Sequence, residues 1–238
     1  MVPIFSTFFD IPLPIILGTS LLVDVIASIS VSYAYARAKN LDIKGTVWIL
    51  VGALLGAQVG SFYVVSVSRI LIMAVLALGM IFFGVKMWRS GLSKYKNKVL
   101  VVPEKISRYL KTPVGMILLG LVIGFTTGIF GAGGGLTIFV ILYSFLNFSL
   151  KKAVGTSSFI MLLTALSGVV GYSQNGNLDI KLGIIIGISA AIGGALSSIL
   201  ANKIREEFLA RIIGAFFIFF AIIMLVLKVL FPLLDIDF

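Results

Sequence analysis

Four glycines stand within five positions, in an otherwise apolar stretch: Gly131, Gly133, Gly134 and Gly135. Glycine costs about 0.8–1 kcal/mol relative to alanine in a helix, so this stretch predicts a break between two membrane helices. In hydrocarbon such a break survives only where protein or a wet cavity covers its backbone groups. Bare N–H groups at a helix start suit an oxyanion, because no formal charge is then buried in lipid. The alternative is a kink that lets two helices cross closely.

A Gly-Thr-Ser motif occurs twice, at residues 18–20 and 155–157, in the first turns of two predicted helices. Their hydroxyls could donate to an anion or satisfy free N–H groups. The alternative is N-terminal capping or back-bonding to the helix, and the two uses are compatible. Because the motif is duplicated, we expect it to contribute to one site shared by two halves of the molecule. The candidate side chains are Thr19, Ser20, Thr156 and Ser157.

Polar side chains inside the predicted helices form a second set of candidates. Asp24 is the only acidic residue deep in a predicted span. A charge at the bilayer midplane costs about 2.5–3.5 kcal/mol on insertion scales, so Asp24 needs a partner, a proton or water. It is either a proton-coupling carboxylate or a residue that hydrogen-bonds to its neighbours, and we favour the second interpretation. Gln58, Thr126 and Thr127 are candidates for lining a pore.

The composition sets the class of protein. Of the 238 residues, 60% are hydrophobic and 12% are charged, whereas a soluble domain is about 45–50% apolar and about 25% charged. The sequence therefore predicts an all-α multi-pass protein of the cytoplasmic membrane. With no cysteine and no histidine, it excludes disulfides, imidazole metal sites and histidine-based catalysis. No nucleotide-binding loop or metal cluster is evident, so we expect no enzyme and no cofactor.

About eight membrane helices are expected, covering residues 15–36, 45–67, 70–85, 114–130, 136–150, 153–172, 182–200 and 212–230. The net charge of +10 could indicate a nucleic-acid partner, but basic residues also collect in cytoplasmic loops, which explains it without one. Residues 86–111 are strongly basic. The predicted division is a first repeat at 1–88, a basic cytoplasmic linker at 89–112 and a second repeat at 113–238. Lys151 and Lys152 are expected in a loop as interfacial anchors.

The internal repeat has an offset of 137 residues, which relates Gly18-Thr19-Ser20 to Gly155-Thr156-Ser157. The same offset relates the pentapeptide at 40–44 to an identical one at 177–181. Each pentapeptide is expected in a tight turn with paired charges. Asp24 corresponds to Met161, so its role is not shared by both halves.

Orientation follows from charge. Two crossings by residues 114–130 and 136–150 place more basic residues inside than one broken crossing does. Each full repeat then has five crossings, and the two repeats are inverted, as in many secondary transporters. Because the second crossing is short, we expect a hairpin of short helices that meet at the glycines. Gly52, Gly56 and Gly60 form a helix face suited to close packing.

The ordered set of these motifs resembles the sulfite exporter TauE/SafE family of membrane permeases. The resemblance rests on residues 128–135, 152–157 and 176–179, on Gly193 and Gly194, and on the duplicated motifs of the first half. It implies a permease for small anions, classically sulfite and related organosulfur anions, working by alternating access. The expected partners are a small anionic substrate and the lipid bilayer, with a second copy of the chain as a further candidate.

One departure from the family pattern concerns the first repeat. The offset places the twin of Gly131–Gly135 just before Met1. We therefore expect a true start upstream or a fragment, rather than a shortened gene product. A short form would lack half of the expected site. The alternative function is then a non-transporting membrane module or helper subunit derived from a permease.

Overall fold

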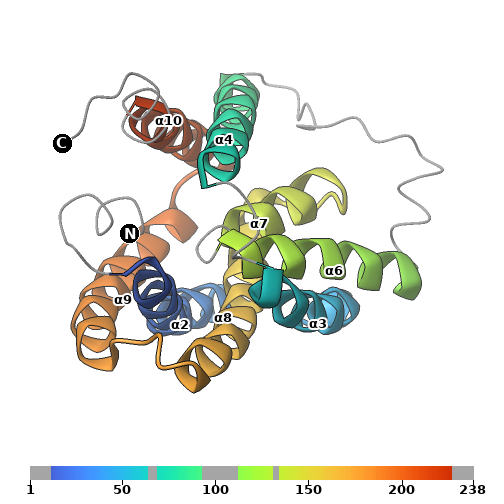
Figure 1. Ribbon diagram of the computed structural model, residues 1–238. Helices are drawn as coiled ribbons and strands as arrows, with labels where there is room; N and C mark the ends of the chain where they lie inside the picture. Colours follow the sequence, from blue (N-terminus) through green and yellow to red (C-terminus); the bar gives the residue numbers. More distant parts are fainter. Residues whose placement is uncertain (1–11, 64–68, 93–111, 131–133, 227–238) are drawn as a thin grey trace. The chain divides into compact units, whose positions relative to one another are not determined.

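The structure is a computed structural model, which describes residues 12–63, 69–92, 112–130 and 134–226. These residues form eight α-helices, one short 3-10 helix and no strand, so the prediction of an all-α fold is confirmed (Figure 1). The helices are α2 (Leu13–Arg37), α3 (Val47–Tyr63), α4 (Arg69–Leu92), α6 (Pro113–Phe130), α7 (Gly134–Ser144), α8 (Leu150–Gln174), α9 (Ile180–Lys203) and α10 (Glu206–Leu225), and the 3-10 helix is η1 (Lys44–Thr46).

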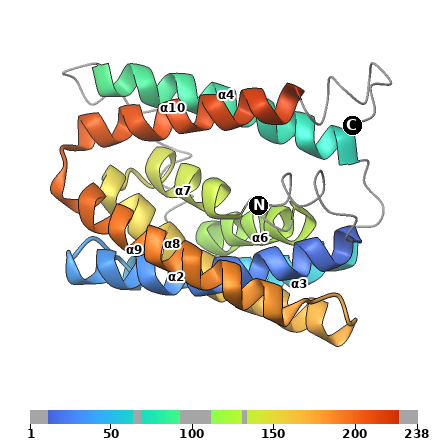
Figure 2. The same ribbon diagram turned by 90° about the vertical axis from the view of Figure 1, so that its left-hand side faces the viewer.

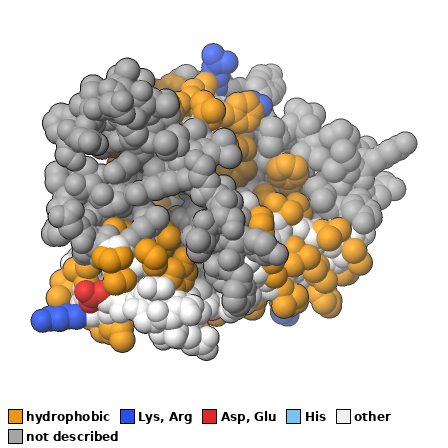
Figure 3. Space-filling view, viewed as in Figure 1, with side chains coloured by type: hydrophobic (Ala, Val, Ile, Leu, Met, Phe, Trp, Pro, Cys, Tyr) orange, Lys and Arg blue, Asp and Glu red, His pale blue; other side chains and the backbone are white. Residues whose placement is uncertain are grey.

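In the described part of the chain, three helices are long and apolar enough to cross a membrane, namely Pro14–Arg37, Leu150–Gln174 and Ile180–Lys203. Large hydrophobic side chains are exposed along α9, where Ile192, Leu196 and Leu200 are 60%, 61% and 64% exposed. On the face shown in Figure 3, the described surface is largely hydrophobic, with few charged side chains. Such a surface suits lipid rather than water. The chain is therefore a multi-pass membrane protein.

The chain divides into two compact units, and each draws on both predicted repeats. The first holds α2, α3, α6, α7, α8 and α9, and the second holds α4 and α10. In the second unit α4 and α10 lie side by side, as both ribbon views show (Figures 1 and 2). Gly84 and Gly214 allow this close approach, because a Cβ on Gly214 would come within 2.8 Å of the Trp88 nitrogen.

In the first unit, α2 and α8 run antiparallel. Gly18, near the start of α2, packs against Tyr172 and the Asn177 carbonyl at the end of α8. Gly155, near the start of α8, packs in the same way against Tyr35 and the Asn40 carbonyl at the end of α2. Because the start of each helix lies against the end of the other, α2 and α8 must run in opposite directions. This is the relation that two inverted repeats require.

Two further helix pairs in this unit are parallel, namely α9 with α2 and α3 with α6. Along α9, Gly183, Gly187 and Gly194 lie against Leu22, Ile26 and Val31 of α2, so α9 follows the direction of α2. Gly52 and Gly56 of α3 face Gly120 and Gly124 of α6 in the same rising order, and backbone lies against backbone there. Close packing by Gly52 and Gly56 was predicted and is confirmed, while the surroundings of Gly60 lie outside the described residues.

These directions make α6 and α7 a hairpin. Helix α3 starts at the end where α2 finishes, and α6, which is parallel to α3, starts there too. Helix α8 also starts there, because it is antiparallel to α2. Helix α6 runs away from this end, so the chain must come back to it through α7 before α8 begins. Helix α7 has 11 residues, about 16 Å at 1.5 Å per residue, which is too short for the roughly 30 Å hydrocarbon core.

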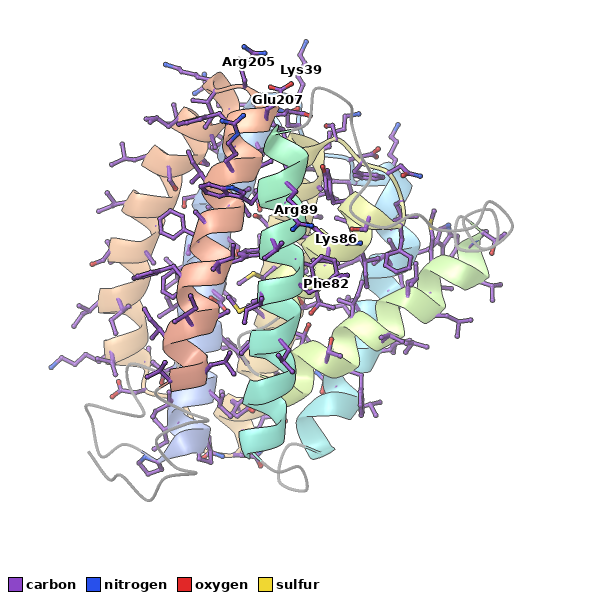
Figure 4. The ribbon with its side chains drawn as sticks, turned by 90° about the horizontal axis from the view of Figure 1, so that it is seen from above. Lys39, Phe82, Lys86, Arg89, Arg205 and Glu207 are labelled. Atoms are coloured by element: carbon purple, nitrogen blue, oxygen red, sulfur yellow. The ribbon has the colours of Figure 1, made fainter. Side chains whose placement is uncertain are left out.

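Several predicted boundaries are wrong, most of them at charged residues. The exception is α7, which ends at Ser144 rather than at residue 150 as predicted. Helix α4 continues past Val85 to Leu92, so Lys86 and Arg89 are helical. On α4, the Lys86 ammonium lies 4.8 Å from the centre of the Phe82 ring one turn earlier (Figure 4). Lys151 and Lys152 belong to the first turn of α8, not to a loop. Glu206 and Glu207 begin α10, where Arg205 and Glu207 form an exposed ion pair at 3.5 Å.

Candidate functional site

The glycine break separates α6 from α7. Helix α6 ends at Phe130 and α7 begins at Gly134, so two helices flank the predicted break. Gly131 and Gly133 lie outside the described residues. Gly135, in the first turn of α7, lies against α8, because a Cβ there would come within 2.5 Å of the Met161 sulfur. The start of α7, whose first N–H groups have no partner within the helix, therefore faces the middle of α8.

The two Gly-Thr-Ser motifs form a reciprocal pair of contacts between the halves. The Thr19 hydroxyl accepts the backbone N–H of Asp179 at 3.1 Å, and the Thr156 hydroxyl accepts that of Asp42 at 3.1 Å. Both threonines are buried, at 4% and 0% exposed. The offset of 137 residues relates both members of one contact to both members of the other. Each helix start is thus bonded to the loop that ends the opposite helix.

The glycine of each motif permits this contact. A Cβ on Gly18 would collide with the Asn177 carbonyl, and one on Gly155 would collide with the Asn40 carbonyl. The motif's serines are also buried but bond within their own helices. Ser20 donates to the Leu17 carbonyl at 2.8 Å, and Ser157 donates to the Val154 carbonyl at 3.0 Å.

Asp42 and Asp179 shape the two loops. Each carboxylate accepts a backbone N–H three residues later, from Gly45 and Leu182 respectively, both at 2.9 Å. These are capping bonds, which supply acceptors to N–H groups at a helix start. The tight turns were predicted correctly. The paired charges were not, because neither aspartate forms an ion pair with the lysine two residues later among the residues that the structure describes.

Polar side chains join three chain segments at the end of the unit where α2 finishes and α8 starts. The Asn40 amide donates to the side-chain oxygen of Asn202 at 2.7 Å, and the Lys151 ammonium donates to the Asn202 carbonyl at 2.7 Å. The predicted cytoplasmic segments 37–44 and 151–152 therefore meet the end of α9 at one end of this unit.

The remaining candidates lie apart from these contacts. Thr126 and Thr127 both donate to the Ile123 carbonyl at 2.8 Å, within α6. The Gln58 amide donates to the Ser167 hydroxyl at 2.8 Å, which joins α3 to α8. Asp24 is half-buried at the middle of α2. Within the described stretches, its carboxylate has no hydrogen bond or ion pair.

The threonine contacts were missed at the sequence level, although the signal was present. Sequence alone indicated duplicated motifs and an inverted relation between the halves. Inversion places the start of one helix beside the end of its twin. The Gly-Thr-Ser starts and the loops at 40–42 and 177–179 could therefore have been matched.

Comparison with known proteins agrees with this architecture. The family model described as Sulfite exporter TauE/SafE matches residues 1–224. The chain is 27% identical over 205 residues to Probable membrane transporter protein YdhB of Bacillus subtilis, covering 85% of this chain and 80% of that protein. It is 26% identical over 220 residues to Probable membrane transporter protein YunE of the same organism, covering 86% and 78%.

An archaeal relative, from Methanocaldococcus jannaschii, is also named a probable membrane transporter protein. It is 28% identical over 227 residues, covering 89% of this chain and 81% of that protein. No solved structure matches the chain significantly. The match to the family model over nearly the whole chain identifies a membrane transporter and not an enzyme. The chain belongs to the sulfite exporter TauE/SafE family.

Proposed function

We propose that this transporter carries a small anion, sulfite or a related organosulfur anion, across the cytoplasmic membrane by alternating access. The observation that carries the proposal is the reciprocal contact of Thr19 with Asp179 and Thr156 with Asp42. The two contacts lie at opposite ends of the antiparallel pair α2 and α8. An alternating-access protein needs two equivalent closures, one toward each side of the membrane.

The anion binds at the start of α7, in this proposal. Gly131–Gly135 supplies backbone N–H groups, and the partial positive charge of a helix start favours an oxyanion without burying a formal charge. The hydroxyls of Thr156 and Ser157 lie on α8 in the turns before Met161 and complete this site when the contact with Asp42 opens, whereas Thr19 and Ser20 lie at the opposite end of the helix pair. In the present structure, the Thr156 oxygen accepts the Asp42 N–H instead, so binding and closure compete for the same side chain.

Basic residues set the orientation. Arg37, Lys39, Lys44, Lys151 and Lys152 lie at the end where α2 finishes and α8 begins. We assign this end to the cytoplasm, because lysine and arginine are enriched in cytoplasmic loops. The contact between Thr156 and Asp42 then closes the cytoplasmic side. The contact between Thr19 and Asp179 closes the outer side.

The test is flux of labelled sulfite and of an organosulfonate in proteoliposomes. We expect saturable flux in the wild type and its loss in Gly135→Leu, whose side chain covers the first turn of α7. Gly193→Leu is the matched control, because nothing lies within 4 Å of a Cβ at Gly193. Full flux in Gly135→Leu would refute the binding site. Wild-type liposomes that exchange neither anion would refute the substrate class.

A further inference from the structure

A stripe of polar side chains runs along one face of α2: Ser20, Asp24, Ser28 and Ser32, which we call the α2 polar stripe. Residues four apart lie on the same face of a helix, and twelve residues span about 18 Å at 1.5 Å per residue. The three serines are buried, at 4%, 4% and 5% exposed, and Asp24 is half-buried between them. A buried polar stripe of this length is unusual in a helix that is long and apolar enough to cross a membrane.

Two members of the stripe lack partners. The Ser32 hydroxyl is buried and has no hydrogen-bond partner among the described residues. The Asp24 carboxylate has neither a hydrogen bond nor an ion pair with any residue that the structure describes. Helix packing alone does not account for such groups, since an unsatisfied buried hydroxyl costs free energy and an ionised carboxylate at midplane costs more.

The stripe belongs to one repeat only. The offset of 137 residues takes Ser20 to Ser157, but takes Asp24, Ser28 and Ser32 to Met161, Ala165 and Val169. Helix α8 packs in the inverted position with apolar residues at those places, so the packing does not require polar ones. Met161, the twin of Asp24, lies against Gly135 at the glycine break. Position 24 is thus the counterpart of a position that borders the proposed anion site.

The helices packed against α2 bring no charge to Asp24. Leu21 and Val25, on either side of Asp24, pack with Ala165 and partly buried apolar residues of α8. The charged residues of α8 and α9 all lie near helix ends, at Lys151, Lys152, Lys181 and Lys203, and the tyrosine of α8 lies near its end at Tyr172. In the described middle parts of α2, α8 and α9, away from the helix ends, Asp24 is the one residue with a carboxyl, amino or phenol group that can exchange a proton.

We propose that Asp24 binds and releases one proton in each transport cycle, and that the serines of the α2 polar stripe hold the water molecules that pass this proton along α2. The inference rests on the proposed function and names its coupling ion. A proton from water on one side joins a carboxylate oxygen of Asp24, and the neutral acid later returns it to water on the other side. Two negative charges near one midplane repel strongly, so an anion binds only when Asp24 is protonated. Carrying one proton with one monovalent anion is electroneutral.

The proton site is tested without any substrate, by infrared spectroscopy of the purified wild-type protein and Asp24→Asn during a pH titration. We expect a protonated-carboxyl band that appears and disappears reversibly with pH in the wild type and is missing in Asp24→Asn. Asp24→Glu should restore a titrating band. A wild-type band that is absent or unchanged throughout the titration would overturn the proposal.

Coupling is tested with isethionate, a monovalent sulfonate that does not titrate near neutral pH. With one proton per anion, a gradient of one pH unit should drive about tenfold accumulation, because one pH unit and a tenfold concentration ratio are equal in free energy. Asp24→Asn should lose this accumulation but keep isethionate exchange. Wild-type accumulation that is independent of the pH gradient would overturn the coupling.

The serine relay needs its own comparison. Ser32→Ala should slow proton-driven accumulation. Ser30→Ala is the control, because Ser30 lies off the stripe and donates to the Ala27 and Ala191 carbonyls. Equal rates for the two variants would refute the relay. Wild-type liposomes that exchange neither isethionate nor sulfite would contradict the proposed function, and the infrared titration would still decide whether Asp24 is a proton site.

Discussion

The Thr156 hydroxyl accepts the Asp42 backbone N–H at 3.1 Å, although the two residues are 114 positions apart in sequence. Its twin, the Thr19 hydroxyl, holds the Asp179 N–H at the same distance. Each contact joins the second turn of one long helix to the capping loop after its antiparallel partner. Both contacts exist at once here, so both ends of the α2 and α8 pair are held together in this structure.

Removing one hydroxyl should weaken the fold. Thr156→Val keeps the shape of the side chain but leaves the Asp42 N–H without its acceptor, at a cost of about 1–3 kcal/mol. Thr156→Ser keeps an acceptor and should cost less. Thermal unfolding in detergent, followed by circular dichroism, measures the difference. Identical melting temperatures for the valine and serine variants would show that the hydrogen bond contributes nothing to stability.

The two threonines should differ in which side they open. Thr19→Val weakens the contact assigned to the outer side, and Thr156→Val weakens the cytoplasmic one. The chain has no cysteine, so a single cysteine placed at Leu41 or Leu178 reports on one loop without background. With a membrane-impermeant maleimide applied from each side in turn, Thr156→Val should increase labelling at Leu41→Cys only, and Thr19→Val at Leu178→Cys only. Increases at both positions in either variant would contradict two separate closures.

The sequence predicted the long helices well because their hydrophobicity dominates. Residues 15–36 and 114–130 were expected as spans, and the structure has α2 at Leu13–Arg37 and α6 at Pro113–Phe130. Most errors arose where a charge was treated as the end of a span, whereas α7 ends at Ser144, before the predicted end at 150, in an uncharged stretch. Lys86 continues α4 because its aliphatic stem lies along the helix and its ammonium rests over Phe82.

The site was less predictable, because its contacts join residues far apart in the chain. The Gly-Thr-Ser motif identified the right residues, but hydroxyl chemistry alone fits an anion, a cap or a loop N–H equally well. Only the antiparallel packing of α2 on α8 brings Thr19 to Asp179. The four-residue spacing of the α2 polar stripe is visible in the sequence. That Ser32 is buried without a hydrogen-bond partner among the described residues can be seen only in the folded chain.

Close backbone packing between α3 and α6 predicts a strong asymmetry among glycine substitutions. A Cβ on Gly120 would collide with the Ile49 carbonyl and lie 2.9 Å from the Ala53 nitrogen, so Gly120→Ala should force the helices apart. Gly193→Ala adds a Cβ in open space and should stabilise α9 by about 0.5–1 kcal/mol, since alanine loses less backbone entropy. Melting temperatures of the two variants should move in opposite directions. A stabilising Gly120→Ala would show that this helix pair has room to adjust.

The ends of α2 and α8 predict a stabilising substitution. After α2, Lys39 adopts a left-handed backbone with φ 57°, and its twin after α8 is Gly176 with φ 68°. Both ends close in the same way, because the N–H groups of Asn40 and Asn177 bond to the carbonyls of Tyr35 and Tyr172 at 2.9 Å. Glycine adopts positive φ without the steric cost that a side chain incurs. Lys39→Gly should therefore raise the melting temperature, whereas Lys39→Ala, which removes the charge but keeps a Cβ, should not. If the alanine variant gains as much as the glycine variant, the charge of Lys39 rather than its backbone conformation limits stability at this helix end.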